Sequence, residues 1–300
     1  MAEALYVVTG ATGHTGALVA SKLLDQKKRV RVVGRSADRL KPFTGRGAEA
    51  AVGSLEDPAF LRAAFAGARA AYVLIPPNLA AKGFRAYQGR VIEALAAGLE
   101  AAKVSHAVTL SSIGADLPAG NGPIAGLHDL EQRLHRIAGL NVLHLRPGYF
   151  MENHLAGIGM VKGMGIYGAA LRPDLRFVQI ATPDIGEVAA RRLLALDFQG
   201  KGIQELHGPR DLSMAEAAAA IGRAIGKPEL KYVQFPYPDA RKGMVGMGLP
   251  EEMADLYVEM SQGFNDGRIQ ATQPRSAATA TPTTIEKFAE SVFAPAFRAS

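Results

Sequence analysis

The feature that most constrains this chain is a glycine pattern near its start. Residues 4–9 form a short apolar run, and the sequence TGATGHTG follows at residues 9–16. The glycines have the spacing G-x-x-G-x-x-G, and apolar residues at helical spacing continue to residue 25. This order predicts a buried strand, a tight turn and a helix whose first N–H groups face an anion such as a pyrophosphate. The alternative is a strand–helix turn without a ligand. The candidate binding residues are Gly10, Thr12, Gly13, His14, Thr15 and Gly16.

Strand-like and helix-like segments then alternate through the first half of the chain. Asp57 can cap a helix that has Pro58 at its first position. Such alternation gives a parallel sheet covered by helices on both faces. We therefore predict an α/β fold with a Rossmann-type doubly wound parallel sheet, whose ligands bind at the carboxyl ends of the strands. Strands are expected at residues 29–34, 48–52, 70–75, 106–110 and 141–145, and helices from residue 58, at 89–103 and at 127–138.

The end of the second strand indicates which dinucleotide would bind. An acidic residue there suits the ribose 2′-hydroxyl of NAD, whereas arginine suits the 2′-phosphate of NADP. Here Arg35 and Ser36 follow the strand, and Arg39 and Lys41 come next. We therefore predict NADP(H), with a solvated basic turn as the alternative. Cofactor contacts are also expected at later strand ends, from Ser54, Pro76, Asn78 and Ser111.

The second half of the chain has a different pattern. Glycines interrupt it as far as residue 168, and we expect segments near residues 177–206 to complete the sheet. Capping boxes at Ser213 and Thr283 precede two helices, while 250–264 is helical, 243–248 mobile and 277–282 a polar linker. The prediction is an NADP-binding Rossmann domain at 1–150, and at 151–300 mainly a smaller C-terminal α/β lobe that binds the substrate.

Composition excludes several kinds of chemistry. The chain has no cysteine, so disulfides, thiolate catalysis and cysteine-ligated metals are ruled out, and no metal site is predicted. A net charge of +6 could favour nucleic acid, but no basic stripe or helix-turn-helix supports it. No apolar run is long enough to cross a membrane, and the start does not resemble a signal peptide. A cytoplasmic protein is expected, without nucleic-acid or membrane partners.

With these motifs, the chain resembles the NmrA-like family of atypical short-chain dehydrogenase/reductases. The landmarks are TGATGHTG, the arginine after the second strand, Ser111-Ser112, the segment His128-x-x-Glu131, the segment RPGYFMEN at residues 146–153, and TPDIG at residues 182–186. The resemblance implies an NADP(H)-binding domain, a smaller lobe and a cleft between them. Relatives include quinone and dye reductases, and also redox-sensing regulators without known catalysis.

One departure from ordinary short-chain dehydrogenases narrows the chemistry. These enzymes use Tyr-x-x-x-Lys to protonate a carbonyl oxygen. Counting back from Arg146, the tyrosine position falls on Ile124 and the lysine position on His128. Extended, electron-poor acceptors such as quinones fit a site without that acid. His128 and Ser111 are the candidate catalytic residues, although His128 could instead bond Glu131 within its helix.

Three further residues are predicted to bind the substrate. Tyr149, Phe150 and Asn153 follow the sixth strand and suit a flat aromatic ligand, with core packing as the alternative.

The favoured function is NADPH-dependent hydride transfer to a quinone-like or conjugated aromatic acceptor. The alternatives are an NADP(H)-sensing regulator that binds a protein partner, a tailoring reductase of an aromatic secondary metabolite, and a disfavoured nucleotide-sugar epimerase. Either a monomer or a homodimer is compatible with the sequence.

Overall fold

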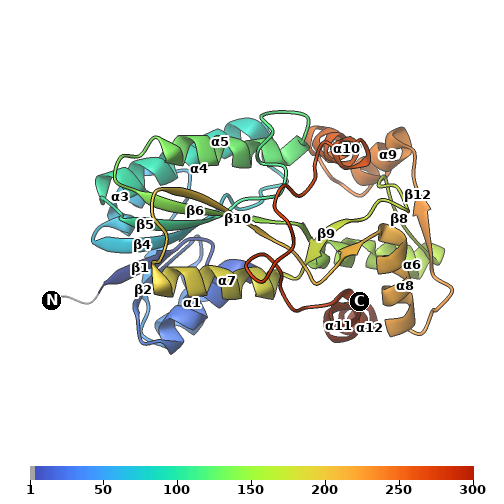
Figure 1. Ribbon diagram of the computed structural model, residues 1–300, viewed down its shortest axis with the longest axis horizontal. Coiled ribbons are helices and arrows are strands. Elements are labelled where there is room, and N and C mark those ends of the chain that lie inside the picture. The colour runs from blue at the N-terminus through green and yellow to red at the C-terminus, as the bar shows by residue number, and fades with distance from the viewer. Residues whose placement is uncertain (1–3) are drawn as a thin grey trace.

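A seven-stranded parallel sheet forms the centre of the computed structural model, which describes residues 4–300 (Figure 1). Its strand order is β10-β6-β5-β4-β1-β2-β3. The strands are β1 (Leu5–Val8), β2 (Arg29–Gly34), β3 (Glu49–Val52), β4 (Ala68–Val73), β5 (His106–Leu110), β6 (Asn141–Pro147) and β10 (Lys201–Leu206). The predicted Rossmann-type fold is therefore confirmed.

Helices cover both faces of this sheet, with α3, α4 and α5 on one side and α1 and α7 on the other (Figure 1). Their bounds are α1 (His14–Asp25), α2 (Ala37–Thr44), α3 (Pro58–Phe65), α4 (Phe84–Ala101), α5 (Ala125–His135) and α7 (Thr182–Ala195). Alternate residues of β1 serve the two faces: Leu5 and Val7 enter one apolar core, and Tyr6 and Val8 enter the other. Both faces are buried, which explains the unbroken apolar run in the sequence.

The strand order places a crevice beside β1. The chain runs from β1 outward through β2 to β3, and then returns to the other side of β1 as β4. Open α/β sheets bind ligands where the order reverses, outside the carboxyl ends of the strands. The glycine-rich turn after β1 lies at this point.

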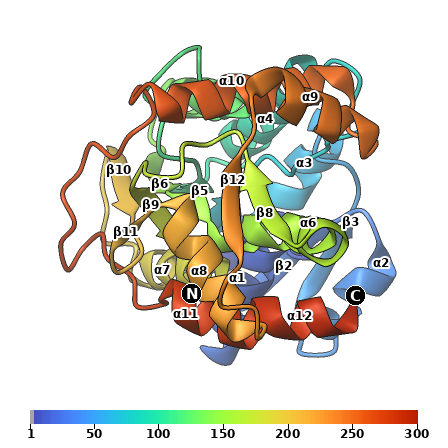
Figure 2. The same ribbon diagram turned by 90° about the vertical axis from the view of Figure 1, so that its right-hand side faces the viewer.

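The C-terminal lobe contains two small sheets of its own (Figure 2). One has the order β11-β9-β7, and the other pairs β12 with β8. The strands are β7 (Tyr149–Phe150), β8 (Ile166–Ala169), β9 (Phe177–Ile180), β11 (Asp211–Leu212) and β12 (Lys231–Gln234). The helices are α6 (Ile158–Met164), α8 (Met214–Ala224), α9 (Tyr237–Gly246), α10 (Glu251–Asn265), α11 (Ile285–Phe288) and α12 (Ala294–Ala299), with short non-α turns η1 (Gly122–Ile124), η2 (Met151–Gly157) and η3 (Ala289–Phe293).

Three sequence predictions need correction here. Only β10 completes the main sheet, because β9 pairs with β7 and β11 instead. The stretch expected to be mobile is helical as far as Gly246, since α9 packs against α10. The loop-rich stretch before residue 168 contains α6 and most of β8. The pairing of β9 depends on contacts between segments distant in the sequence, which local propensity does not describe.

Two predicted helix starts are confirmed and one is wrong. Asp57 accepts hydrogen bonds from the N–H groups of α3, and Ser213 forms a complete capping box with Glu216. At α11 the cap is Thr284 rather than Thr283. The N–H and hydroxyl of Thr283 bind the Asp184 carboxylate instead, at 3.0 and 2.8 Å.

A segment that we call the strap, residues 268–282, runs from α10 toward α11 and crosses the edge strand β10 (Figure 1). The buried Glu205 carboxylate accepts hydrogen bonds from the Thr272 N–H and hydroxyl (2.9 and 2.7 Å) and from the Gln273 N–H (3.0 Å). It also lies 3.0 Å from the imidazole of His207. The strap thereby covers a sheet edge that would otherwise stay open. Within residues 4–300, no helix is long and apolar enough to cross a bilayer.

Glu205→Gln should lower the free energy of unfolding by about 1–3 kcal/mol at pH 7, because an amide cannot accept all these hydrogen bonds. Burial alone would raise the pKa of the Glu205 carboxyl, but the bonds from His207, Thr272 and Gln273 outweigh it and keep the pKa below its ordinary value. The stabilisation is therefore complete above about pH 4.3 and disappears as the pH falls through the lowered pKa. Urea unfolding across pH measures this.

The control is Glu187→Gln, which removes an exposed ion pair with Lys22. An equal loss in both variants would contradict the assigned role of Glu205.

Candidate functional site

The turn after β1 has the geometry of an anion-binding loop. Gly10 has φ +62°, and the Gly13 N–H donates to its carbonyl at 2.9 Å. A Cβ at Gly16 would lie 2.3 Å from the Gly10 oxygen, so only glycine lets α1 pack this closely. A Cβ at Gly13 would meet only that oxygen, at 3.4 Å. Gly13 therefore leaves space for a ligand at the N-terminus of α1, where the first N–H groups lack partners within the helix.

The other predicted residues of this turn lie in different surroundings. Thr12 is half-buried and His14 is exposed, so both are accessible to a ligand. Thr15 is buried, and its hydroxyl accepts a hydrogen bond from Tyr72 at 2.9 Å. Only its backbone therefore faces the ligand position.

The basic segment after β2 lies beside this turn. Arg35 is exposed and forms no ion pair within residues 4–300. The guanidinium of Arg39 donates to the Thr12 carbonyl at 3.1 Å, whereas Lys41 pairs with Asp38 at 2.8 Å. Ser36 caps α2. Arg35 is therefore the arginine of this segment without a protein partner in residues 4–300, and Arg39 links α2 to the glycine turn.

Three predicted cofactor residues lie at further strand ends. Ser54 is exposed, and its hydroxyl accepts the Glu56 N–H at 3.2 Å. The Pro76 carbonyl accepts a hydrogen bond from Tyr87 at 2.9 Å. Asn78 is half-buried two residues further on.

A cavity of about 590 Å³ opens between the sheet and the C-terminal lobe. One wall is formed by residues after β4 and β5, including Pro76 and Ser111, and α10 contributes another. The predicted substrate residues all line it, as do Met253 and Tyr257; the full polar and aromatic set is Phe84, Gln88, Ser111, Ser112, Tyr149, Phe150, Asn153, Arg176, Phe177, Asp211, Tyr257, Phe264 and Gln270. The lining is mostly apolar, as in sites for flat organic ligands.

Behind this cavity lies a buried ion pair. The Arg146 guanidinium binds the Glu131 carboxylate through two hydrogen bonds, at 2.9 and 2.6 Å. The Ser111 hydroxyl donates to the same carboxylate at 2.5 Å. Ser111 is therefore held by Glu131 and presents only its oxygen lone pairs to the cavity.

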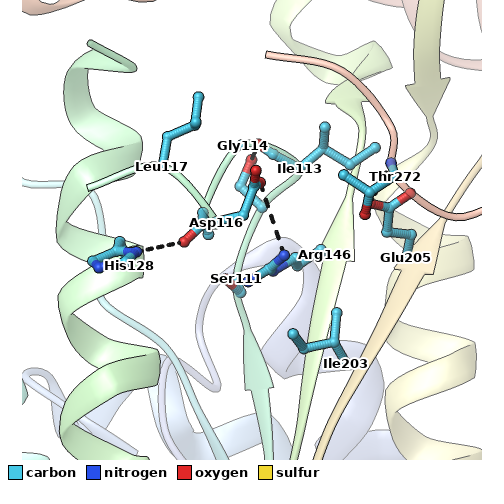
Figure 3. Close-up of polar contacts among 12 residues, drawn as sticks. Ser111, Ile113, Gly114, Asp116, Leu117, His128, Arg146, Ile203, Glu205 and Thr272 are labelled. Atoms are coloured by element: carbon cyan, nitrogen blue, oxygen red, sulfur yellow. Dashed lines mark hydrogen bonds and ion pairs between the residues drawn. The ribbon is translucent and has the colours of Figure 1, made fainter. Parts of the chain in front are cut away.

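His128 does not form the bond to Glu131 that the sequence offered as the alternative to a catalytic role. It is absent from the cavity lining, and its Nδ1 lies 2.9 Å from the Ala115 carbonyl (Figure 3). Glu131 is not its partner, because that carboxylate binds Ser111 and Arg146. The same loop carries Asp116, which lies 3.8 Å from Arg146. Ile124, where counting back from Arg146 put the tyrosine position of ordinary short-chain dehydrogenases, lines the cavity.

Sequence reasoning missed two of these relations. The pairing of Glu131 with Ser111 spans 20 residues, and that of Arg39 with Thr12 spans 27, so no local spacing reveals either. The described residues also contain no group of three or more histidine or acidic side chains that could hold a metal ion.

The NmrA-like family profile matches residues 3–289, and the chain belongs to this family. An NAD(P)H azoreductase from Xenophilus azovorans is 30% identical over 262 residues, which cover 85% of this chain and 86% of that protein. A (4-alkanoyl-5-oxo-2,5-dihydrofuran-3-yl)methyl phosphate reductase from Streptomyces griseus is 26% identical, covering 90% of both. Among solved structures, an NADPH-dependent quinone oxidoreductase from Escherichia coli in complex with NADPH has a TM-score of 0.82 at 22% identity, covering 96% of this chain and 99% of that one.

Glu131→Gln should destabilise the protein by about 3–5 kcal/mol, because it leaves the Arg146 charge buried without a counter-charge. Chemical denaturation of the purified variant measures the loss.

Asp116→Asn is the matched control, because Asp116 is 41% exposed and only approaches the same guanidinium. It should change stability little. If the two variants were equally stable, the buried ion pair would not stabilise the protein to the extent assigned.

Proposed function

We propose that this protein is an NADPH-dependent oxidoreductase that transfers hydride to a quinone-like or conjugated aromatic acceptor. The observation that carries the proposal is the apolar cavity at the carboxyl ends of β4 and β5, next to the crevice beside β1. Residues 1–150 then bind the cofactor, and residues 151–300 close the acceptor site. The relatives described above, which are reductases by name, support this reaction class.

The residues present fit an NADP(H) dinucleotide. The glycine turn leaves space at Gly13 for a pyrophosphate, and the N-terminus of α1 provides N–H donors. Arg35 supplies a free positive charge for the 2′-phosphate, with Ser36 and Lys41 nearby. Pro76 and Ser111 border the cavity where the nicotinamide would meet the acceptor.

When bound, NADPH supplies a hydride. The chain contributes an apolar enclosure and a Ser111 oxygen that Glu131 holds as a hydrogen-bond acceptor, suited to an amide N–H. Ile124 cannot donate a proton, and His128 is bonded to the loop after β5. An acceptor whose reduced form delocalises its charge suits such a site, because solvent can protonate it later.

We assign His128 a positioning role instead of direct contact with the acceptor. Its bond to Ala115 holds the 113–117 loop, whose Ile113 lines the cavity.

The test of this proposal is NADPH oxidation with a panel of quinones, azo dyes and triphenylmethane dyes. We expect turnover with at least one class. Tight NADPH binding without turnover of any acceptor would contradict the proposal and favour an NADP(H) sensor.

Arg35→Ala should weaken NADPH binding by about 10- to 100-fold and leave NADH binding unchanged, because only NADPH carries the 2′-phosphate. Calorimetric titration with both cofactors measures the two affinities.

Arg62→Ala removes another exposed arginine, on α3. It should leave both affinities unchanged. If Arg35→Ala weakened NADPH and NADH equally, the assignment of Arg35 to the 2′-phosphate would be wrong.

A further inference from the structure

Few side chains inside the cavity can donate a hydrogen bond to an occupant. The hydroxyl of Ser111 donates to Glu131, and that of Ser112 donates to the Ile113 carbonyl. Gln88 donates to the Pro123 carbonyl at 3.0 Å and accepts from Arg85 at 2.9 Å. These groups are therefore largely occupied by the protein itself.

Two tyrosines of the lining differ from these side chains, because their hydroxyls are not occupied by other described residues of the protein. Tyr149 and Tyr257 both line the cavity and are half-buried, and neither hydroxyl has a hydrogen-bond partner within residues 4–300. Most other tyrosine hydroxyls do have one: Tyr72, Tyr87, Tyr167, Tyr232 and Tyr237 bind other protein groups at 2.6–2.9 Å. The exception, Tyr6, lies on β1 and does not line the cavity. Neither the Tyr149 nor the Tyr257 hydroxyl is among the fully buried polar atoms that lack a partner, so solvent can reach both in the open cavity. An occupant that displaces this solvent has to replace its hydrogen bonds, which makes the two hydroxyls available for recognition.

The two tyrosines come from different parts of the fold and line the same cavity. Tyr149 lies on β7, directly after the sheet, and its ring packs edge-on against Phe177 with 5.7 Å between centroids. Tyr257 comes from α10, which contributes another part of the lining. Burial raises the pKa of both phenols, and the neighbouring Tyr257 raises that of Tyr149 further. Both hydroxyls therefore keep their protons at neutral pH and can act as donors.

Two other polar side chains of the lining are unpaired in the described part of the chain, but they do not serve as hydrogen-bond donors inside the cavity. Asn153 and Gln270 are exposed, so they belong to the rim of the cavity, where water can satisfy them. Within residues 4–300, the two phenols are the lining side chains whose hydroxyls have no protein partner.

We propose that Tyr149 and Tyr257 form an oxygen-recognition pair that donates hydrogen bonds to a carbonyl oxygen of the acceptor. The substrate class is then a conjugated carbonyl compound, such as a quinone or an enone, in preference to a dye without a carbonyl group. That this carbonyl compound is reduced rests on the proposed function, whereas its recognition by the two tyrosines does not. A ligand without an oxygen would leave both donors buried and unpaired, and sites built in this way discriminate strongly.

The first experiment measures binding without turnover. Protein saturated with NADP⁺, which cannot donate hydride, is titrated calorimetrically with 1,4-naphthoquinone and with naphthalene, which has the same ring system without carbonyl groups. Wild type should bind the quinone about tenfold or more tightly than the hydrocarbon. Tyr149→Phe and Tyr257→Phe should each weaken quinone binding by about three- to tenfold and leave naphthalene binding equal or tighter.

Tyr237→Phe is the matched control. It removes a hydroxyl that contacts Asn265 outside the cavity, so both affinities should stay unchanged. An unaltered quinone preference in the Tyr149→Phe, Tyr257→Phe double variant would overturn the proposal, as would equal affinities of wild type for the two ligands.

Kinetics separate this inference from the proposed function. If wild type reduces quinones, the phenylalanine variants should lose kcat/KM for quinones while keeping it for a carbonyl-free triphenylmethane dye and keeping NADPH affinity. If the double variant lost the quinone preference in binding while wild type turned over no acceptor, the tyrosine pair would be supported and the reductase function rejected. Normal quinone kinetics in the double variant would reject the pair and leave the reductase standing.

Discussion

The buried ion pair between Glu131 and Arg146 is the interaction on which the site depends. Its two charges are almost completely shielded from water, with side chains 1% and 7% exposed. The pair joins α5 to β6, and through the hydroxyl of Ser111 it also joins the end of β5. Removing one partner would leave an unpaired charge in the interior, so the pair strongly constrains how α5, β5 and β6 pack together. The ion pair thereby fixes Ser111, which lines the cavity.

Other sequence landmarks act as contacts between the sheet and the lobe. Glu152 accepts hydrogen bonds from the Thr182 N–H and hydroxyl at the start of α7, and Asp184 binds Thr283 before α11. The Glu252 carboxylate from α10 accepts the N–H groups of Gly83 and Phe84, at the start of α4. The landmark residues Glu152, Thr182 and Asp184 therefore build the scaffold around the cavity, together with the contact of Glu252. They identify the family well and say little about the acceptor, because the acceptor meets other side chains.

The sequence predicted local features accurately and distant partnerships poorly. It located β5 at residues 106–110 and the cap of α3 at Asp57, because apolar runs and cap chemistry are local. It offered Glu131 as a partner for His128, since the two lie on one helix face. The structure pairs Glu131 with groups on β5 and β6. Burial and geometry decide which of several donors binds one carboxylate, and helical spacing alone does not describe either.

By itself, the amino-acid sequence determined the alternating fold, the glycine turn and the absence of cysteine chemistry, because these follow from residue type and short-range order. Only the tertiary structure decided which polar groups remain free. It satisfied the hydroxyls of Thr15 and Ser111 within the protein and left those of Tyr149 and Tyr257 unpaired at the cavity. The physical reason is that a hydrogen-bonding group becomes available to a ligand only when no protein group, near or far in the chain, reaches it first.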